Sequence, residues 1–140
     1  MKKRTTVLVA FLGIVFFMSL SAFTPQTEGQ KKGAPWDIPE SYKTKVNPNA
    51  GDESLVSVGK MIYMKHCRSC HGNTGMGDGP KARNLETFPG KFNDPKFQEE
   101  ADGVIYYQSI IGRGDMPNYE SKIPDDEDRW AIVMYLRTLK

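Results

Sequence analysis

The chain has 140 residues, which is enough for one domain with an extension. Its hydrophobic fraction of 39% and charged fraction of 26% are those of an ordinary globular protein. The formal net charge is +2, and three of the 19 basic residues lie in the first four positions, so the remainder of the chain has no basic excess. The charge therefore gives no indication of a nucleic-acid partner, which needs Lys and Arg clustered on one face.

The N-terminal segment has the composition of an export signal. Basic residues in MKKR precede VLVAFLGIVFFM, an apolar run of 12 residues, and small residues follow in SLSAF. This order predicts a signal peptide over residues 1–22. An uncleaved N-terminal anchor is the alternative, because residues 5–24 are long enough to span a bilayer. Both interpretations predict an exported, periplasmic protein, either soluble or tethered to the outer face of the cytoplasmic membrane.

Residues 23–50 form a proline-rich extension. They contain four prolines and show no sustained helical or strand periodicity, which is typical of a linker or a docking arm. Trp36 and Tyr42 are unusual in a free linker. They either dock on the following domain or are scattered exposed aromatic residues.

The remainder, residues 51–140, is predicted to be one all-α domain. Apolar residues recur at helical spacing in three segments: 52–67, 101–112 and 125–140. Acidic residues open the last of these and basic residues close it, in agreement with the helix dipole. The Gly- and Pro-rich segments 71–80 and 113–124 are predicted loops, and 81–97 holds at most a short helix.

Both cysteines of the chain lie in CRSCH, as Cys67 and Cys70, and His71 follows directly. A disulfide across so small a loop would stabilise little, and a thioredoxin-type pair needs a βαβ context that is missing. A zinc site needs four ligands, but these residues and His66 lie too close together in the chain to surround one ion. The Cys-x-x-Cys-His pattern is typical of covalent haem attachment through two thioethers. It predicts one haem c per chain, bound through Cys67 and Cys70, with His71 as an iron ligand.

A second axial ligand must reach the opposite face of the haem ring. Met116 lies in GRGDMPNY, 45 residues after His71, where glycines allow the loop to approach the ring and Pro117 stiffens it. Met76 is too close to His71 to pass around the ring. The other methionines of the domain are expected to pack within helices: Met61, Met64 and Met134. Met116 is therefore the predicted ligand.

These motifs resemble those of class I monohaem cytochromes c over residues 52–140. The segments that carry the resemblance are CRSCHG, GMGDGP, IIGRGDMPNY and WAIVMYLRTL. The resemblance implies the cytochrome c fold, with three to four helices around one covalently bound haem and the first and last helices crossing. It implies that Gly59 permits this crossing and that Tyr63 packs on the last helix, against candidates Ile132, Tyr135 and Leu136.

The resemblance also implies that the carbonyl of Pro80 accepts a hydrogen bond from the His71 ring, which would fix its orientation. It does not identify the partners of the haem propionates. Arg83, Arg113 and Tyr119 are candidates for that role, each equally consistent with a surface position. His66 is expected to be exposed and uninvolved.

With His71 and Met116 both on the iron, no coordination position is open to a substrate, and the domain offers no nucleophile or acid–base pair. We therefore expect no enzyme and no small-molecule substrate, but transfer of single electrons between redox proteins of the respiratory chain. One alternative is a permanent haem subunit of a membrane complex, with residues 24–50 as its docking arm. Another is a haem enzyme or gas sensor in which Met116 dissociates.

Overall fold

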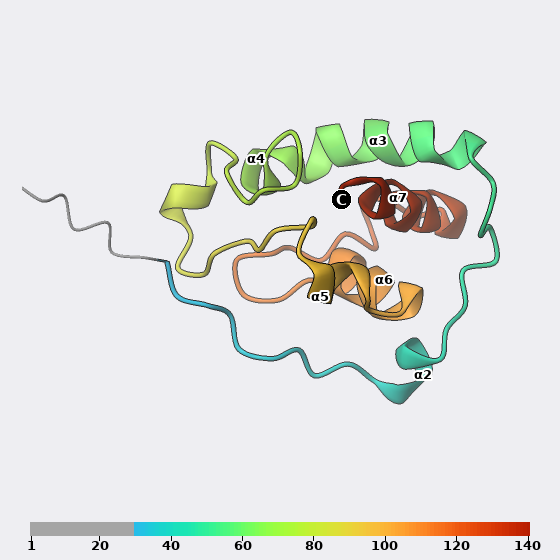
Figure 1. Ribbon diagram of the computed structural model, residues 1–140, viewed down its shortest axis with the longest axis horizontal. Coiled ribbons are helices and arrows are strands. Elements are labelled where there is room, and N and C mark those ends of the chain that lie inside the picture. Colours follow the sequence, from blue (N-terminus) through green and yellow to red (C-terminus); the bar gives the residue numbers. More distant parts are fainter. Residues whose placement is uncertain (1–29) are drawn as a thin grey trace, which may run out of the picture.

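The computed structural model describes residues 30–140, and Figure 1 shows their arrangement. The helices are α2 (Glu40–Lys43), α3 (Ser54–His66), α4 (Arg68–His71), the 3-10 turn η1 (Ala82–Asn84), α5 (Pro95–Gln98), α6 (Asp102–Ile111) and α7 (Asp126–Thr138). Within this range the only β-type pairings are two isolated bridges. The predicted all-α fold class is confirmed, and α3, α6 and α7 correspond to the three predicted long helices.

The signal peptide or anchor predicted for residues 1–22 lies outside the described residues. Among the helices of residues 30–140, none has the length and apolar character needed to cross a membrane.

Local sequence explains where the last helix begins. The Asp125 side chain accepts a hydrogen bond of 2.9 Å from the backbone N–H of Glu127, which is the usual N-capping interaction. Three acidic residues occupy the first turn of α7 and Arg137 lies in the last turn, so both ends complement the helix dipole.

Helices α3 and α7 cross at Gly59, as the resemblance implied (Figure 1). A Cβ atom at Gly59 would lie 1.9 Å from the carbonyl oxygen of Ala131, so the two backbones meet where a side chain is missing. One turn later, Tyr63 is fully buried and its ring centroid lies 5.2 Å from that of Tyr135. The predicted roles of Gly59 and Tyr63 are both confirmed.

The core lies between α3, α6 and α7. Its largest fully buried side chains are Trp130, Tyr63, Ile105, Ile110, Ile132, Leu136 and Val133. Met64 packs against this core from a partly buried position, as predicted. Met61 does not, because 65% of the residue is exposed. The reason is helical geometry: Met61 is two residues from both Gly59 and Tyr63, and therefore lies on the opposite face of α3.

Residues 30–50, called the arm below, lie along the domain and pass beside α6 (Figure 1). The ring centroid of Tyr107 on α6 lies 6.5 Å from that of Trp36 and 4.8 Å from that of Tyr42. A Cβ atom at Gly103 would lie 2.1 Å from the carbonyl oxygen of Tyr42, so the arm approaches the α6 backbone closely. Of the two alternatives for Trp36 and Tyr42, docking on the domain is confirmed.

Gly59→Ala tests the helix crossing. The added methyl group overlaps the Ala131 carbonyl, so we expect the free energy of unfolding to fall by at least about 1 kcal/mol, although alanine favours an isolated helix by up to about 1 kcal/mol over glycine. Lys60→Ala, at the exposed next position, is the control and should change stability by less than about 0.5 kcal/mol. Denaturant unfolding of the haem-loaded protein measures both. Equal midpoints for the two variants would show that the crossing tolerates a side chain.

Candidate functional site

The two cysteines and His71 lie on one helical turn that directly follows α3: Cys67 precedes α4, and Cys70 and His71 end it. The backbone N–H groups of Cys70 and His71 both donate to the carbonyl oxygen of Cys67, at 3.1 and 3.0 Å. The hydroxyl of buried Tyr63 donates to the carbonyl oxygen of Gly72 at 2.7 Å and so ties the residue after His71 back to α3. No disulfide joins Cys67 and Cys70. The turn therefore presents two thiols and an imidazole from one short, well-held segment.

The His71 side chain is buried, with 8% of the residue exposed. Its ring stacks on Phe92, with centroids 4.7 Å apart and an angle of 18° between the planes. Burial lowers the pKa of His71 to about 4, so the imidazole is neutral at physiological pH. A neutral imidazole is the form that binds a metal ion.

The Nδ1 atom of His71 is buried and has no hydrogen-bond partner among the described residues. In this structure Nδ1 does not donate to the carbonyl of Pro80, and the ring stacks on Phe92, so the bond to Pro80 stays a prediction. A buried polar atom without a partner is rare in a folded protein and indicates a ring whose polar contacts are completed by another group.

Burial also governs the first thiol. It raises the pKa of Cys67 to about 12, and the nearby Cys70 contributes in the same direction. Cys67 is therefore a protonated thiol at neutral pH and not a thiolate. Within the described residues, no three His, Cys, Asp or Glu side chains converge as a metal site.

Met116 reaches the same region from a tight loop after α6. Gly112 ends α6 with φ +68°, and a Cβ atom there would lie 2.3 Å from the carbonyl oxygen of Pro117, so only glycine allows the loop to turn back. The backbone N–H of Met116 donates to the carbonyl oxygen of Arg113 at 2.9 Å. The hydroxyl of Tyr119 donates to the carbonyl oxygen of His66 at 3.0 Å, directly before Cys67.

One small cavity brings three of the five predicted site residues together, whereas Cys70 and Pro80 do not line it. Its lining is Tyr63, Cys67, His71, Phe92, Ser109, Met116, Ile132 and Leu136. Cys67, His71 and Met116 thus meet although Met116 lies 45 residues after His71. Sequence reasoning missed Phe92 and Ser109, because Phe92 lies in a segment without periodicity and Ser109 shows no distinguishing pattern.

The donor set in this cavity fits haem c. It combines the Cys67 thiol, which is suited to a thioether bond, a neutral imidazole and a soft thioether sulfur, while Cys70 lies on the same turn outside the lining. The free volume is about 10 Å³, which is barely enough to admit one water molecule. A porphyrin is accommodated only when lining side chains such as Phe92 move apart. The lining residues therefore have the chemistry that haem c requires, but their side chains must move apart to make room for it.

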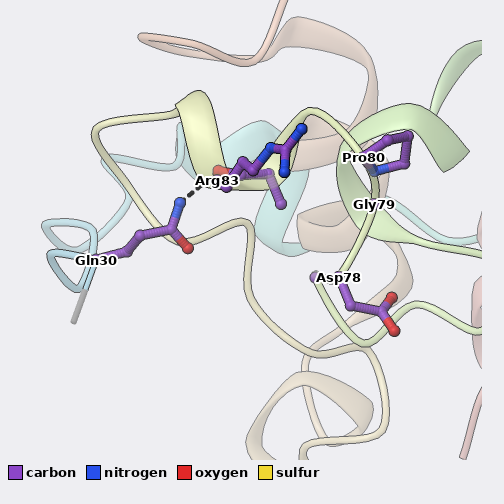
Figure 2. A pocket seen from close by; sticks show the side chains of 7 residues that line it. Gln30, Asp78, Gly79, Pro80 and Arg83 are labelled. Carbon is purple, nitrogen blue, oxygen red and sulfur yellow. Dashed lines mark hydrogen bonds between the residues drawn. The ribbon is translucent and has the colours of Figure 1, made fainter. Parts of the chain in front are cut away.

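Pro80 lies elsewhere, on an open cleft shown in Figure 2 together with Gln30, Asp78, Gly79 and Arg83. Pro80 is exposed. The flanking N–H of Gly79 donates to the carbonyl of Cys70 at 3.2 Å, so this segment lies against α4. Gln30 closes the other side of the cleft by donating to the carbonyl of Ala82.

The candidate propionate partners have different surroundings. Arg83 is exposed on the cleft of Figure 2. The Arg113 guanidinium binds the arm, because it donates a hydrogen bond of 2.8 Å to the carbonyl oxygen of Pro35. Tyr119 is buried, and its hydroxyl already donates a hydrogen bond to the carbonyl oxygen of His66. His66 was expected to be exposed, but it is half-buried because its ring packs on that of Tyr119, with 5.8 Å between the ring centroids.

Comparison with known proteins agrees with this geometry. The family model described as Cytochrome c matches residues 56–140. No curated protein matches the chain significantly. The family match covers more than half of the chain and includes the two cysteines, His71 and Met116. The chain therefore belongs to the cytochrome c family, and its cofactor is covalently bound haem c.

Proposed function

We propose that this protein carries single electrons between redox proteins of a respiratory chain, with haem c attached to Cys67 and Cys70 and its iron ligated by His71 and Met116. Membership of the cytochrome c family supports haem binding and electron transfer. The observation that carries the ligand assignment is the shared cavity, which places Met116 with Cys67 and His71. The other methionines of residues 30–140 do not line this cavity.

The bound haem iron supplies one reversible one-electron step. The protein's part is to hold and shield it. His71 needs to lose no proton before coordinating at neutral pH, because burial already lowers its pKa to about 4. The thioether of Met116 is a soft ligand that favours reduced iron and so raises the reduction potential.

Apolar side chains supply the shielding. Tyr63, Ile132 and Leu136 line the cavity and are at most 2% exposed. They would keep water away from the site, which would disfavour the oxidised, more highly charged iron and add to the effect of the methionine. With His71 and Met116 both on the iron as proposed, no coordination position is left for a substrate, which supports an electron carrier and not an enzyme.

The surface beside the cysteines is the proposed approach for a redox partner, whether a free protein or a membrane complex that holds this chain permanently. Lys65 and Arg68 are exposed on either side of Cys67. Domains of this family typically work outside the cytoplasm. We place this protein in the periplasm, delivered or tethered there by its N-terminal segment.

Replacing Cys67 and Cys70 together with alanine tests the attachment. With no thiol available, haem should be removed from the denatured chain by acid extraction, and mass spectrometry should show the mass of the polypeptide alone. Each single variant should keep one thioether and therefore the added mass of the haem. Ser69→Ala, between the two cysteines, is the matched control and should load normally. Haem that stays covalently bound in the double variant contradicts the assignment.

Met116→Ala tests the axial ligand and separates a carrier from a catalyst. The haem should stay attached through Cys67 and Cys70, while the methionine–iron absorption band of the ferric protein disappears. The reduction potential should fall because the soft ligand is lost, and the reduced protein should gain carbon monoxide binding that the parent protein lacks. Optical spectra and a redox titration measure these changes.

Met76→Ala and Met134→Ala are the controls for this experiment. Both side chains are partly buried but lie outside the shared cavity, so the absorption band should remain. Met134→Ala is still expected to reduce stability, but by less than the roughly 2–5 kcal/mol that loss of a fully buried methionine costs, because Met134 is only partly buried. If the band survives in Met116→Ala and is lost in either control, another methionine is the ligand. Carbon monoxide binding by the parent protein would favour the enzyme or sensor alternative.

A further inference from the structure

The arm contacts the loop that carries Met116 at Arg113. The Arg113 guanidinium donates hydrogen bonds to the carbonyl oxygens of Ala34 and Pro35. It also lies over the indole ring of Trp36, with 3.9 Å between its Cζ atom and the ring centroid. Because the guanidinium is planar and its donors form a fixed fork, two carbonyls and one aromatic face together determine its position.

Trp36 is held in turn by the domain. Its ring meets Tyr107 of α6 edge to face, with centroids 6.5 Å apart and planes at 84°. Tyr107 also contacts the ring of Tyr42, further along the arm, at 4.8 Å. A continuous row of side chains therefore runs from Arg113 through Trp36 to α6 and attaches the arm segment that binds Arg113 to this helix.

Arg113 and Met116 lie on the same tight backbone turn. The carbonyl oxygen of Arg113 accepts the N–H of Met116 at 2.9 Å, and the two residues form an isolated antiparallel bridge. Gly114 between them has φ +54°. Residues 113–116 are thus one closed turn, so fixing Arg113 also fixes the backbone from which the Met116 side chain projects.

The rest of the loop is attached to the domain itself. The carboxylate of Asp115 accepts the N–H of Glu86 at 3.1 Å, and the hydroxyl of Tyr119 reaches the carbonyl of His66. These contacts lie within residues 56–140, which the family model covers, whereas Ala34, Pro35 and Trp36 lie before that range. The hold on Arg113 is therefore supplied by a segment that this chain adds to the family domain.

We propose that Trp36 and Arg113 are positioning residues that hold the turn 113–116 and thereby keep the Met116 sulfur on the haem iron. This inference rests on the proposed ligation by Met116. Opening of the loop removes the sulfur from the iron, and it also requires Arg113 to leave its two carbonyls and the indole. The arm thus lowers the population of the open loop, and an external ligand must compete against that closed state.

Imidazole titration of the haem-loaded, ferric, full-length protein measures this competition, because imidazole binds only where the sulfur has left. We expect Trp36→Ala and Arg113→Ala each to bind imidazole about tenfold more tightly than the parent protein. The double variant should match the single ones, since the two residues act as one unit. Arg113→Lys keeps the charge but loses the fork, and should not restore the parent affinity.

Lys45→Ala is the matched control. Lys45 also belongs to the arm and also places a cation over an aromatic ring, 4.7 Å from the centroid of Tyr106, but it makes this contact away from the Met116 loop. Its loss should leave imidazole affinity at the parent value. An equal increase in Lys45→Ala would assign the effect to general loosening of the arm and overturn the positioning role.

Hydrogen exchange of the Met116 amide gives a second readout that does not depend on ligand binding. Exchange should quicken in Trp36→Ala and Arg113→Ala and stay unchanged in Lys45→Ala. Parent-like imidazole affinity and parent-like exchange in the first two variants, with the methionine–iron band present, would overturn this inference alone. A parent protein without that band would overturn the ligand assignment, and this inference with it.

Discussion

The contact between the backbones of α3 and α7 at Gly59 is the constraint on which the site depends. Because Gly59 has no side chain, α3 lies directly on Ala131, and this fixes where α3 ends and where the cysteine turn begins. Tyr63, one turn later, fills the space against Tyr135, and its hydroxyl holds the backbone immediately after His71. The position of the haem-binding turn thus follows from a helix crossing that contains no ligand.

The second half of the site is brought in by the chain that returns after α6. Gly112 turns the backbone sharply, and Tyr119 joins the end of the Met116 loop to the carbonyl of His66. One tyrosine therefore connects the two segments that supply the proposed ligands. Burial of His71 lowers the pKa of its imidazole, so the ring stays neutral although no charged group of the described residues lies beside it.

Much of this arrangement could be predicted from the sequence. The periodicity of apolar residues located α3, α6 and α7, and the spacing of Cys67, Cys70 and His71 indicated the haem. Met116 could be selected because loop geometry and distance along the chain exclude the other methionines. The predicted helices and the haem are confirmed because they depend on local patterns, while the selection of Met116 stays a prediction that the shared cavity supports.

Contacts between segments without periodicity could not be predicted. Phe92 stacks on His71 from such a segment, and Arg113 binds carbonyl groups of the arm, which no sequence pattern specifies. The apolar character of Met61 predicts a packing role, whereas its position on the helix places it outside the core. The bond from His71 to Pro80 follows from the resemblance alone, and in this structure the ring stacks on Phe92 without it.

The docking of the arm also determines where the preceding chain joins the domain. A free segment of residues 30–50 could extend about 70–75 Å and would leave the start of the arm far from the domain. Here Gln30 donates to the carbonyl of Ala82 and Tyr42 packs on Tyr107, so the arm runs back along the domain and starts beside the cleft of Figure 2. The chain therefore joins the domain next to Ala82 and not at the start of α3.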